Sequence, residues 1–232
     1  MTAGDVLVLR PQPGVDETVA ALRAAGFRAL ARPVLAVEAL AETRALRARI
    51  QDLDHYDAVI FVSPASVRVG MRWIDRHWPQ YPLRTVWIAV GARTAEELAF
   101  FGIRAVRPQT DERAEGLLAL AELAPGRVER VLIVRGEGGR ELLLEALTAR
   151  GASVDLLEVY RRRPIPVELP PAGAVAAAVA SSGEVLDAFL ASGGAALADR
   201  PLLVPSERVA ERARAAGFRH VVTASGAGPA AT

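Results

Sequence analysis

The sequence contains no cysteine, which excludes disulfide bonds, thiolate nucleophiles and cysteine-ligated metal sites. A cysteine-free chain is compatible with a reducing compartment. The three histidines, His55, His77 and His220, do not have the spacing of a metal-binding motif. We therefore expect a cytoplasmic protein that binds no metal.

Long apolar runs are also absent. The longest Ala/Val stretch, AVAAAVA at 174–180, is far too short to span a bilayer. The N-terminal stretch MTAGDVLVLRPQPG has neither the basic start nor the small-residue cleavage site of a signal peptide. The formal net charge is only +1, so no overall field draws the protein to nucleic acid. We expect neither a membrane nor a nucleic-acid partner.

Lysine is missing as well, so all 28 basic residues are arginine. A biased base composition of the gene would account for this. An arginine-only surface also suits carboxylate or phosphate ligands, which guanidinium groups bind in a bidentate manner. Both interpretations stay open.

What the sequence does contain is a repeated alternation of short apolar runs and helical stretches. The runs DVLVLR, YDAVIFVS, TVWIAVG, RVLIVRG and PLLVPS each lead into a helical pattern, and AEGLLALAEL reads as one further helix. Gly26, Gly102, Gly151 and Gly217 follow helical stretches, at positions where left-handed backbone ends a helix. The pattern predicts an α/β protein whose parallel sheets are covered by helices on both faces.

The segment GARTAEELAFFGIRAV at 91–106 aligns without gaps on SERVAERARAAGFRHV at 206–221. This similarity indicates two similar half-proteins with a ligand between them, although any two strand–helix–glycine–strand units resemble each other to some extent. The sequence holds about ten candidate strands, which suits two sheets of about five.

Two extended, proline-containing segments, RPVLAVEA and EVYRRRPIPVELPP, flank the middle of the chain and predict two crossings between domains. We expect one domain from residues 1–33 plus 167–232 and a second from 39–158. The linkers would lie at about 34–38 and 159–166, with a cleft between the domains.

The stretch VRGEGGREL at 134–142 has the glycines of a phosphate-binding turn. It lacks the Lys-Ser/Thr pair of a Walker A loop, and Glu141 stands where a dinucleotide fingerprint needs its third glycine. The hypothesis of a nucleotide-dependent enzyme therefore rests on this loop alone. Flexible glycines beside the positive end of a helix suit any anion, and Arg135 and Arg140 flank them.

Similar turns follow other expected strands. Ser63, Gly91 with Thr94, Ser181 with Ser182, and Ser206 precede helices at what would be the carboxyl edge of a sheet, where open α/β folds bind ligands. Ordinary N-capping by Ser or Thr explains any single one of them. Taken together, they indicate a ligand with several negative groups.

Familiar catalytic motifs do not occur, and Tyr160, in LLEVYRRRP, is the most informative polar aromatic residue. It lies at an expected crossing next to three arginines. A phenol there can donate a proton to a leaving hydroxyl group. A tyrosine packed at a domain edge is the alternative interpretation.

The ordered set of these patterns resembles the uroporphyrinogen-III synthase family over nearly the whole chain. VLVLRP and ARPVL resemble the family's opening, YDAVIFVSPASV its Ser-Pro turn, and VWIAVGARTAEEL its central unit. VLIVRGEGGRELLLEAL, GASVDLLEVYRRRP and LLVPSERVAERARAAGF follow in the family's order, with Tyr160 at the end of a Gly-Ala-x-Val strand. Each piece is weakly specific, whereas the ordered set is strongly so.

The resemblance implies two similar α/β domains, joined by a two-stranded linker, with the first domain built from both chain ends. It implies a lyase of tetrapyrrole and haem biosynthesis. Linear hydroxymethylbilane, a small polycarboxylate substrate, would lose water and close to uroporphyrinogen III, with its last pyrrole inverted through a spiro intermediate. The resemblance also implies that the protein needs no cofactor, binds its substrate largely through backbone N–H groups and is a monomer. A non-catalytic binding or sensor protein of the same fold is the alternative.

The resemblance also implies roles for individual residues. Tyr160 matches the family's tyrosine proposed to assist loss of the hydroxyl group, Thr94 the threonine of the central unit, and Ser63 the serine of the Ser-Pro turn. The other candidate substrate-binding residues fall in motifs at the cleft edge: Arg10, Arg135, Gly136, Gly138, Gly139, Arg140, Ser181 and Ser206.

Two features depart from the family pattern. Ala65 stands where members often carry a polar or basic side chain, so a ligand contact would be missing. The chain ends in ASGAGPAAT, where a last helix is usual.

Overall fold

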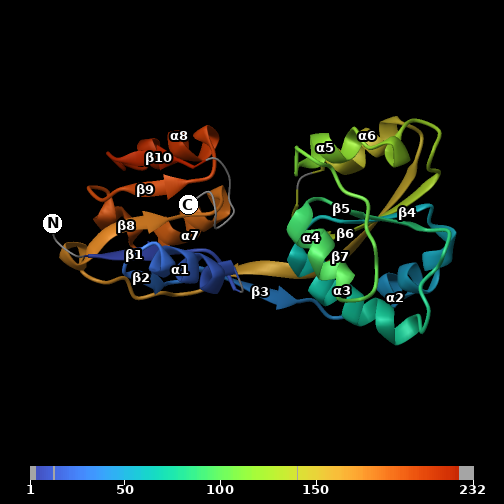
Figure 1. Cartoon of the computed structure of the whole chain (residues 1–232), viewed down its shortest axis with the longest axis horizontal. Coiled ribbons are helices and arrows are strands. Elements are labelled where there is room, and N and C mark those ends of the chain that lie inside the picture. The colour runs from blue at the N-terminus through green and yellow to red at the C-terminus, as the bar shows by residue number, and fades with distance from the viewer. Residues whose placement is uncertain (1–3, 13, 140, 225–232) are drawn as a thin grey trace. The chain divides into compact units, whose positions relative to one another are not determined.

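The computed structural model describes residues 4–12, 14–139 and 141–224 of the 232. They form two five-stranded sheets, which agrees with the expected strand number. The chain divides into two compact units, of which unit 1 comprises Met1–Val37 and Arg162–Thr232 and unit 2 comprises Glu38–Arg161. The predicted α/β class, with helices flanking mainly parallel sheets, is confirmed (Figure 1).

The sheet of unit 1 has the strand order β10-β9-β8-β1-β2, and its paired strands are parallel. Three helices follow its strands in the chain. Strand β1 connects through a helix to β2 on one side, whereas β8 connects to β9 on the other, so the order reverses between β1 and β8. The elements of this unit are β1 (Asp5–Val8), α1 (Gly14–Ala24), β2 (Ala29–Ala31), β8 (Val175–Val179), α7 (Gly183–Ala191), β9 (Leu202–Val204), α8 (Glu207–Ala215) and β10 (Val221–Thr223).

The sheet of unit 2 has the order β3-β7-β6-β4-β5, with β4, β5, β6 and β7 parallel. Its order reverses between β4 and β6, because β4 leads to β5 and β6 leads to β7. The elements are β3 (Leu35–Ala39), α2 (Arg44–Gln51), β4 (Ala58–Phe61), α3 (Pro64–His77), β5 (Val86–Ala89), α4 (Ala92–Ala99), α5 (Ala114–Leu118), β6 (Arg130–Gly136), α6 (Leu142–Ala149) and β7 (Ser153–Pro164). Short 3-10 helices occupy Leu53–His55 and Ala121–Leu123 in unit 2, and Ala172–Ala174 and Gly194–Leu197 in unit 1.

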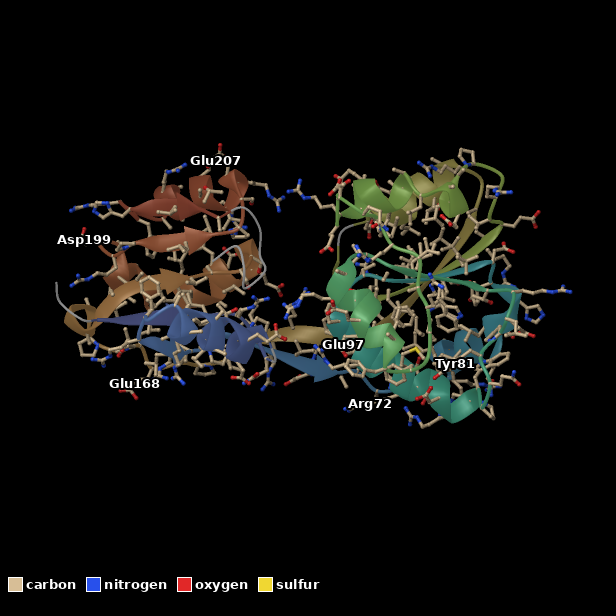
Figure 2. All side chains as sticks on the ribbon, viewed as in Figure 1. Arg72, Tyr81, Glu97, Glu168, Asp199 and Glu207 are labelled. Atoms are coloured by element: carbon tan, nitrogen blue, oxygen red, sulfur yellow. The ribbon has the colours of Figure 1, made fainter. Side chains whose placement is uncertain are left out.

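Each sheet is buried on both faces. In β1, Leu7 belongs to one apolar cluster while Val6 and Val8 belong to another, as the alternation of a strand requires. In unit 2, α3 approaches its sheet closely at Gly70, where an added Cβ would lie 2.8 Å from Val134 Cγ1. Charged side chains project outward from both units (Figure 2).

The chain passes between the units along β3 and β7. The amide of Leu40 donates to the carbonyl of Val159 at 2.9 Å, and that of Ile165 donates to the carbonyl of Val34 at 3.0 Å, so the two segments run antiparallel. Strand β7 is 12 residues long and continues to Pro164. The expectation that this strand ends at Tyr160 is therefore wrong, because pairing with β3 extends it.

The glycines predicted to end helices do so. Gly26, Gly102, Gly151 and Gly217 have φ angles of 88°, 74°, 92° and 98°, in the left-handed region that glycine adopts without strain. The two segments that align in the sequence, 91–106 and 206–221, each contain a helix, a glycine with a positive φ angle and a segment that pairs with the sheet again. Val106 forms a parallel bridge with Ile88, and Val221 pairs in parallel with Leu202.

One helical expectation is wrong, and one helix was not expected. AEGLLALAEL is not one helix: α5 ends at Leu118, and Leu120 is extended, with ψ of 138°. Arg150 stabilises the break by donating to the carbonyls of Leu118 and Leu123 at 2.8 and 2.7 Å. Helix α2 was not predicted at all, although Thr43 caps it by accepting from the Leu46 amide at 3.2 Å.

No helix within the described ranges is long and apolar enough to cross a membrane.

Candidate functional site

Three of the predicted site residues meet at the point where the strand order of unit 2 reverses. Strands β4 and β6 are parallel neighbours, with Phe61 opposite Val134, so the turns that follow them lie at the same edge of the sheet. Ser63 begins the first turn and Gly136 the second, and Tyr160 of β7 pairs with Gly136. This edge is where open α/β sheets bind ligands.

Tyr160 packs directly on the backbone of Gly136. The register shifts between Arg135 and Gly136, so that Glu158 pairs with Arg135 but Tyr160 with Gly136. Such an irregularity re-aims a side chain. A Cβ added to Gly136 would lie 2.6 Å from Tyr160 Cζ and 3.0 Å from its hydroxyl oxygen. Only glycine therefore leaves room for the ring, which is 2% exposed.

Ser63 holds the hydroxyl group of Tyr160. Its Oγ lies 3.1 Å from Tyr160 Oη, and either oxygen can be the donor. The same Oγ accepts from the Ser66 amide at 3.0 Å, and Ser66 Oγ accepts from the Ser63 amide at 3.2 Å, which completes a capping box at the start of α3. Both the predicted N-capping role of Ser63 and a contact with Tyr160 are thus present in one side chain.

Arg135 is turned inward. Its side chain is nearly buried, and it donates from Nε to the carbonyl of Gly136 at 3.1 Å and from Nη2 to that of Gly139 at 2.5 Å. Its Nε also lies 3.6 Å from the Glu158 carboxylate. The guanidinium group therefore holds the turn at 136–139 through two of its carbonyl groups. Within this turn only Gly138 has a positive φ, of 69°.

A carboxylate of the protein itself occupies the start of α4. Glu112 Oε1 accepts from the Ala92 amide at 2.7 Å, and a Cβ on Gly91 would lie 2.5 Å from the Glu112 carboxyl group. Thr94, in the first turn of α4, is 2% exposed. Sequence reasoning missed Glu112, because nothing in the spacing of 21 positions from Gly91 signals that they meet.

Two candidates of unit 1, Arg10 and Ser181, follow the strands where the order reverses, since Val8 of β1 pairs with Val179 of β8. Ser206 follows the next strand, β9. Arg10 folds over the start of α1 and donates to Thr18 Oγ1 at 3.0 Å. Ser182, rather than Ser181, is the N-cap of α7, where it accepts from the Val185 amide at 3.2 Å. Ser206 is the N-cap residue of α8 without a side-chain capping bond within the described structure.

Arg140 lies outside the described residues. Among the residues that are described, no group of three or more histidine, aspartate and glutamate side chains could hold a metal ion. A surface hollow of about 940 Å³ lies elsewhere in unit 2, between α2, the edge of β7 and Leu144 of α6, and none of the predicted site residues lines it.

Similarity to known proteins indicates the family of this chain. The sequence model of the family described as uroporphyrinogen-III synthase HemD matches residues 16–232. This chain belongs to the uroporphyrinogen-III synthase family. It is 32% identical to the uroporphyrinogen-III synthase of Escherichia coli K12 over 237 residues, covering 96% of this chain and 95% of the relative. It is 38% identical to that of Salmonella typhimurium over 160 residues, covering 68% of this chain but 64% of the relative's length.

Solved structures of the family share the fold. A mutant uroporphyrinogen III synthase from the extremely thermophilic bacterium Thermus thermophilus superposes with a TM-score of 0.64 at 21% identity, covering 95% of this chain and 92% of that one. The uroporphyrinogen-III synthetase of Helicobacter pylori 26695 gives 0.57 at 13% identity, covering 98% and 95%. At these identities the likeness concerns the fold alone, and the resemblance of the sequence to the family is confirmed by the family model and the relatives.

Proposed function

We propose that this chain is a uroporphyrinogen-III synthase, a lyase that closes linear hydroxymethylbilane with loss of water and inversion of the last pyrrole ring. It acts on a small molecule in tetrapyrrole biosynthesis, and its place of action would be the cytoplasm. The observation that carries the proposal is the meeting of Tyr160, Ser63 and Gly136 at the reversal point of the unit 2 sheet, in a chain of this family.

Tyr160 would be the proton donor. The substrate's hydroxyl is a poor leaving group unless it departs as water, which requires a proton at the moment the C–O bond breaks. The Tyr160 hydroxyl is the acidic O–H held at this edge, and its ring is fixed by Gly136. Holding the two ends of the bilane close together would supply much of the remaining rate, because orientation alone lowers the barrier to ring closure.

The substrate's acetate and propionate groups would bind at the surrounding turns. Carboxylates suit the N–H groups at helix starts, and the arginines and hydroxyl groups beside these starts can add hydrogen bonds. We propose this role for Thr94 and the turn of Gly136, Gly138 and Gly139 in unit 2, and for Arg10, Ser181 and Ser206 in unit 1, whereas Ser63 would act on Tyr160, which it contacts. Arg135 would act by shaping its turn, since its guanidinium group already binds two of the turn's carbonyls.

The test is to supply hydroxymethylbilane to the purified protein, without any cofactor, and to resolve the oxidised products by chromatography. The type III isomer is the expected product. If only the type I isomer forms, which is the spontaneous product, the protein does not catalyse the reaction. A binding or sensor protein of the same fold would then be favoured.

The first prediction concerns Tyr160→Phe. Losing the proton donor should lower kcat by about 100-fold, at the low end of general acid catalysis. The fold should persist, because the ring still fills its place and one hydrogen bond is worth only about 1 kcal/mol. Steady-state kinetics and thermal unfolding of both forms measure this, and an unchanged kcat would remove Tyr160 from the mechanism.

A further inference from the structure

We infer that Ser63 is a positioning residue for Tyr160, through which the start of α3 stabilises the phenolate that remains after Tyr160 has donated its proton. This inference rests on the proposed function, in which Tyr160 is the donor. It assigns Ser63 to the chemical step rather than to substrate binding.

The hydrogen-bonding capacity of Ser63 Oγ supports this role. A serine hydroxyl has one donor and two acceptor positions. One acceptor position is taken by the Ser66 amide at 3.0 Å, and Tyr160 Oη lies 3.1 Å away. While Tyr160 is neutral, either hydroxyl can donate to the other. Once Tyr160 has lost its proton, Ser63 is the donor of these two hydroxyl groups.

The bond between these two oxygens therefore strengthens during the reaction. A hydrogen bond to an ionised acceptor is roughly twice as strong as a neutral one. Stabilisation that appears only as charge develops lowers the barrier, whereas stabilisation already present in the ground state does not. The near-complete burial of Tyr160 increases this effect, because little water is available to solvate the phenolate.

The geometry around both hydroxyls is fixed. The capping box restrains the Ser63 side chain, and the close approach of Gly136 restrains the Tyr160 ring. Helix α3 has 14 residues, so the partial positive charge at its start is well developed and lies at Ser63 itself. No reorganisation is needed when the charge forms.

The protons balance as follows. Tyr160 gives its proton to the substrate's hydroxyl group, the C–O bond breaks and water leaves. Ser63 keeps its own proton and only donates a hydrogen bond to the phenolate. When the macrocycle closes, the substrate carbon that forms the new C–C bond releases a proton, which restores the Tyr160 hydroxyl. The sum is the loss of one water molecule from the substrate.

The experiment is a double-mutant cycle on the full chain with hydroxymethylbilane as substrate. We expect Ser63→Ala to lower kcat about tenfold with little change in KM, since a hydrogen bond to a developing charge is lost. In the Tyr160→Phe background the same change should lower kcat less than twofold, because there is no phenolate left to stabilise. Ser63→Thr keeps the hydroxyl group and should retain most of the activity.

Two controls separate this role from helix capping. Thr43→Ala removes the N-cap of α2, which lies outside the site. It should lower Tm by about 2–4 °C and leave kcat within about twofold. Ser63→Asp keeps a capping oxygen but cannot donate, so it should fold well and lose more activity than Ser63→Thr, even if Ser63→Ala is too unstable to assay.

Three results would overturn the inference. One is an effect of Ser63→Ala on KM alone, which would indicate direct substrate binding. Another is an equal loss of kcat in the wild-type and Tyr160→Phe backgrounds. The third is a fall in Tm with unchanged kcat, as expected of the Thr43→Ala control. Failure of the proposed function is distinguishable, because wild-type protein would then form only the type I isomer.

Discussion

At the scale of single residues, Gly136 has no room for a side chain. Its missing Cβ is the space in which the Tyr160 ring lies, with three ring or hydroxyl atoms at 2.6–3.0 Å from where that Cβ would be. Its backbone is not in the left-handed region, so the requirement for glycine comes from the neighbour and not from φ.

Gly136→Ala should therefore move the Tyr160 ring. We expect a loss of about 1–3 kcal/mol in the free energy of unfolding, as for other overpacked positions, together with a loss of kcat at least as large as that of Tyr160→Phe. Urea unfolding and steady-state kinetics measure the two effects. Gly173→Ala is a matched control, because an added Cβ there meets nothing within 4 Å. Equal behaviour of the two variants would contradict the proposed packing.

The sequence predicted which residues gather at the site better than it predicted what they contact. Ser63, Gly136 and Tyr160 follow strands that are recognisable from local apolar runs. The inward orientation of Arg135 and the carboxylate of Glu112 at the start of α4 depend on contacts between segments that no local pattern encodes.

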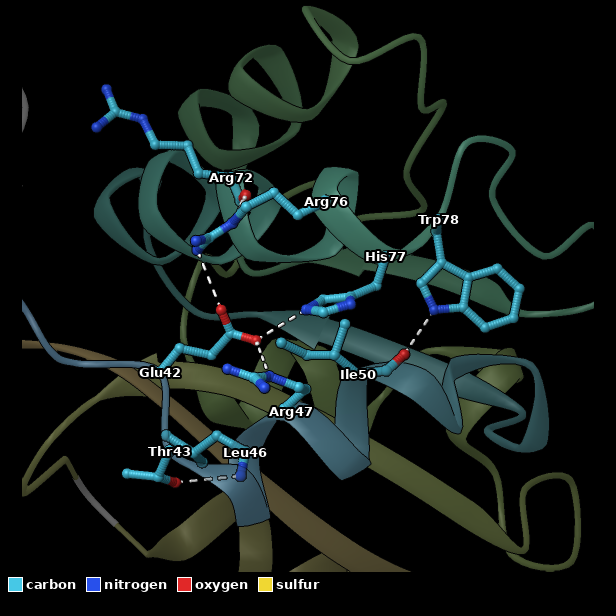
Figure 3. Close-up of polar contacts among 9 residues, drawn as sticks. All are labelled: Glu42, Thr43, Leu46, Arg47, Ile50, Arg72, Arg76, His77 and Trp78. Carbon is cyan, nitrogen blue, oxygen red and sulfur yellow. Dashed lines mark hydrogen bonds and ion pairs between the residues drawn. The ribbon is translucent and has the colours of Figure 1, made fainter.

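At the scale of elements, Glu42 joins α2 to α3 (Figure 3). Its Oε1 lies 2.8 Å from His77 Nε2 and 3.1 Å from Arg47 Nε, and its Oε2 lies 3.2 Å from Arg76 Nη2. The Glu42 side chain is 10% exposed. Burial, the largest single influence, raises the pKa of Glu42, but the hydrogen bonds from His77 and Arg47 and the charge of Arg76 together bring it below its ordinary value.

This lowered pKa makes a prediction about acid stability. A carboxyl group whose pKa is lower in the folded state stabilises the fold fully above its unfolded pKa, and this stabilisation is lost as the pH falls through the folded pKa. Glu42→Gln should cost about 1–3 kcal/mol near pH 7, because two arginines and His77 lose the charge of their common acceptor. The difference from wild type should shrink toward pH 3. Urea unfolding at pH 7, 5 and 3 measures it, and a constant difference would contradict the role of the charge.

Local signals account for most of the elements. Glycines after helices and continuous apolar strands are properties of short segments, and their predictions are confirmed at Gly26 and Gly217. Helix α2 escaped prediction because RALRARIQ is short and rich in arginine, and it buries only Ile50. The division of AEGLLALAEL depends on Arg150, which lies 27 positions beyond Leu123 and donates to its carbonyl.

At the scale of the whole molecule, the two units have separate apolar cores. Leu186 of α7 and Phe189 belong to the core of unit 1, whereas Leu147 of α6 and Ile133 belong to that of unit 2. Joined by two strands, the units are expected to unfold in separate thermal transitions.

Leu147→Ala should therefore lower the midpoint temperature of the unit 2 transition in calorimetry, and Leu186→Ala that of the unit 1 transition. Each substitution should reduce the free energy of unfolding of its own unit by about 2–5 kcal/mol. Both side chains are fully buried, so the two variants are matched. A single transition that shifts equally in both variants would show that the units unfold together.

The interleaving of the two units has a consequence for synthesis on the ribosome. Strand β1 lies inside its sheet, between β2 and β8, and β8 begins only at Val175. The whole of unit 2 emerges before that strand is made. The N-terminal segment β1–α1–β2 must therefore wait with one side of β1 open while unit 2 folds, and a nascent chain of this protein would show protease resistance first in its middle and last at its beginning.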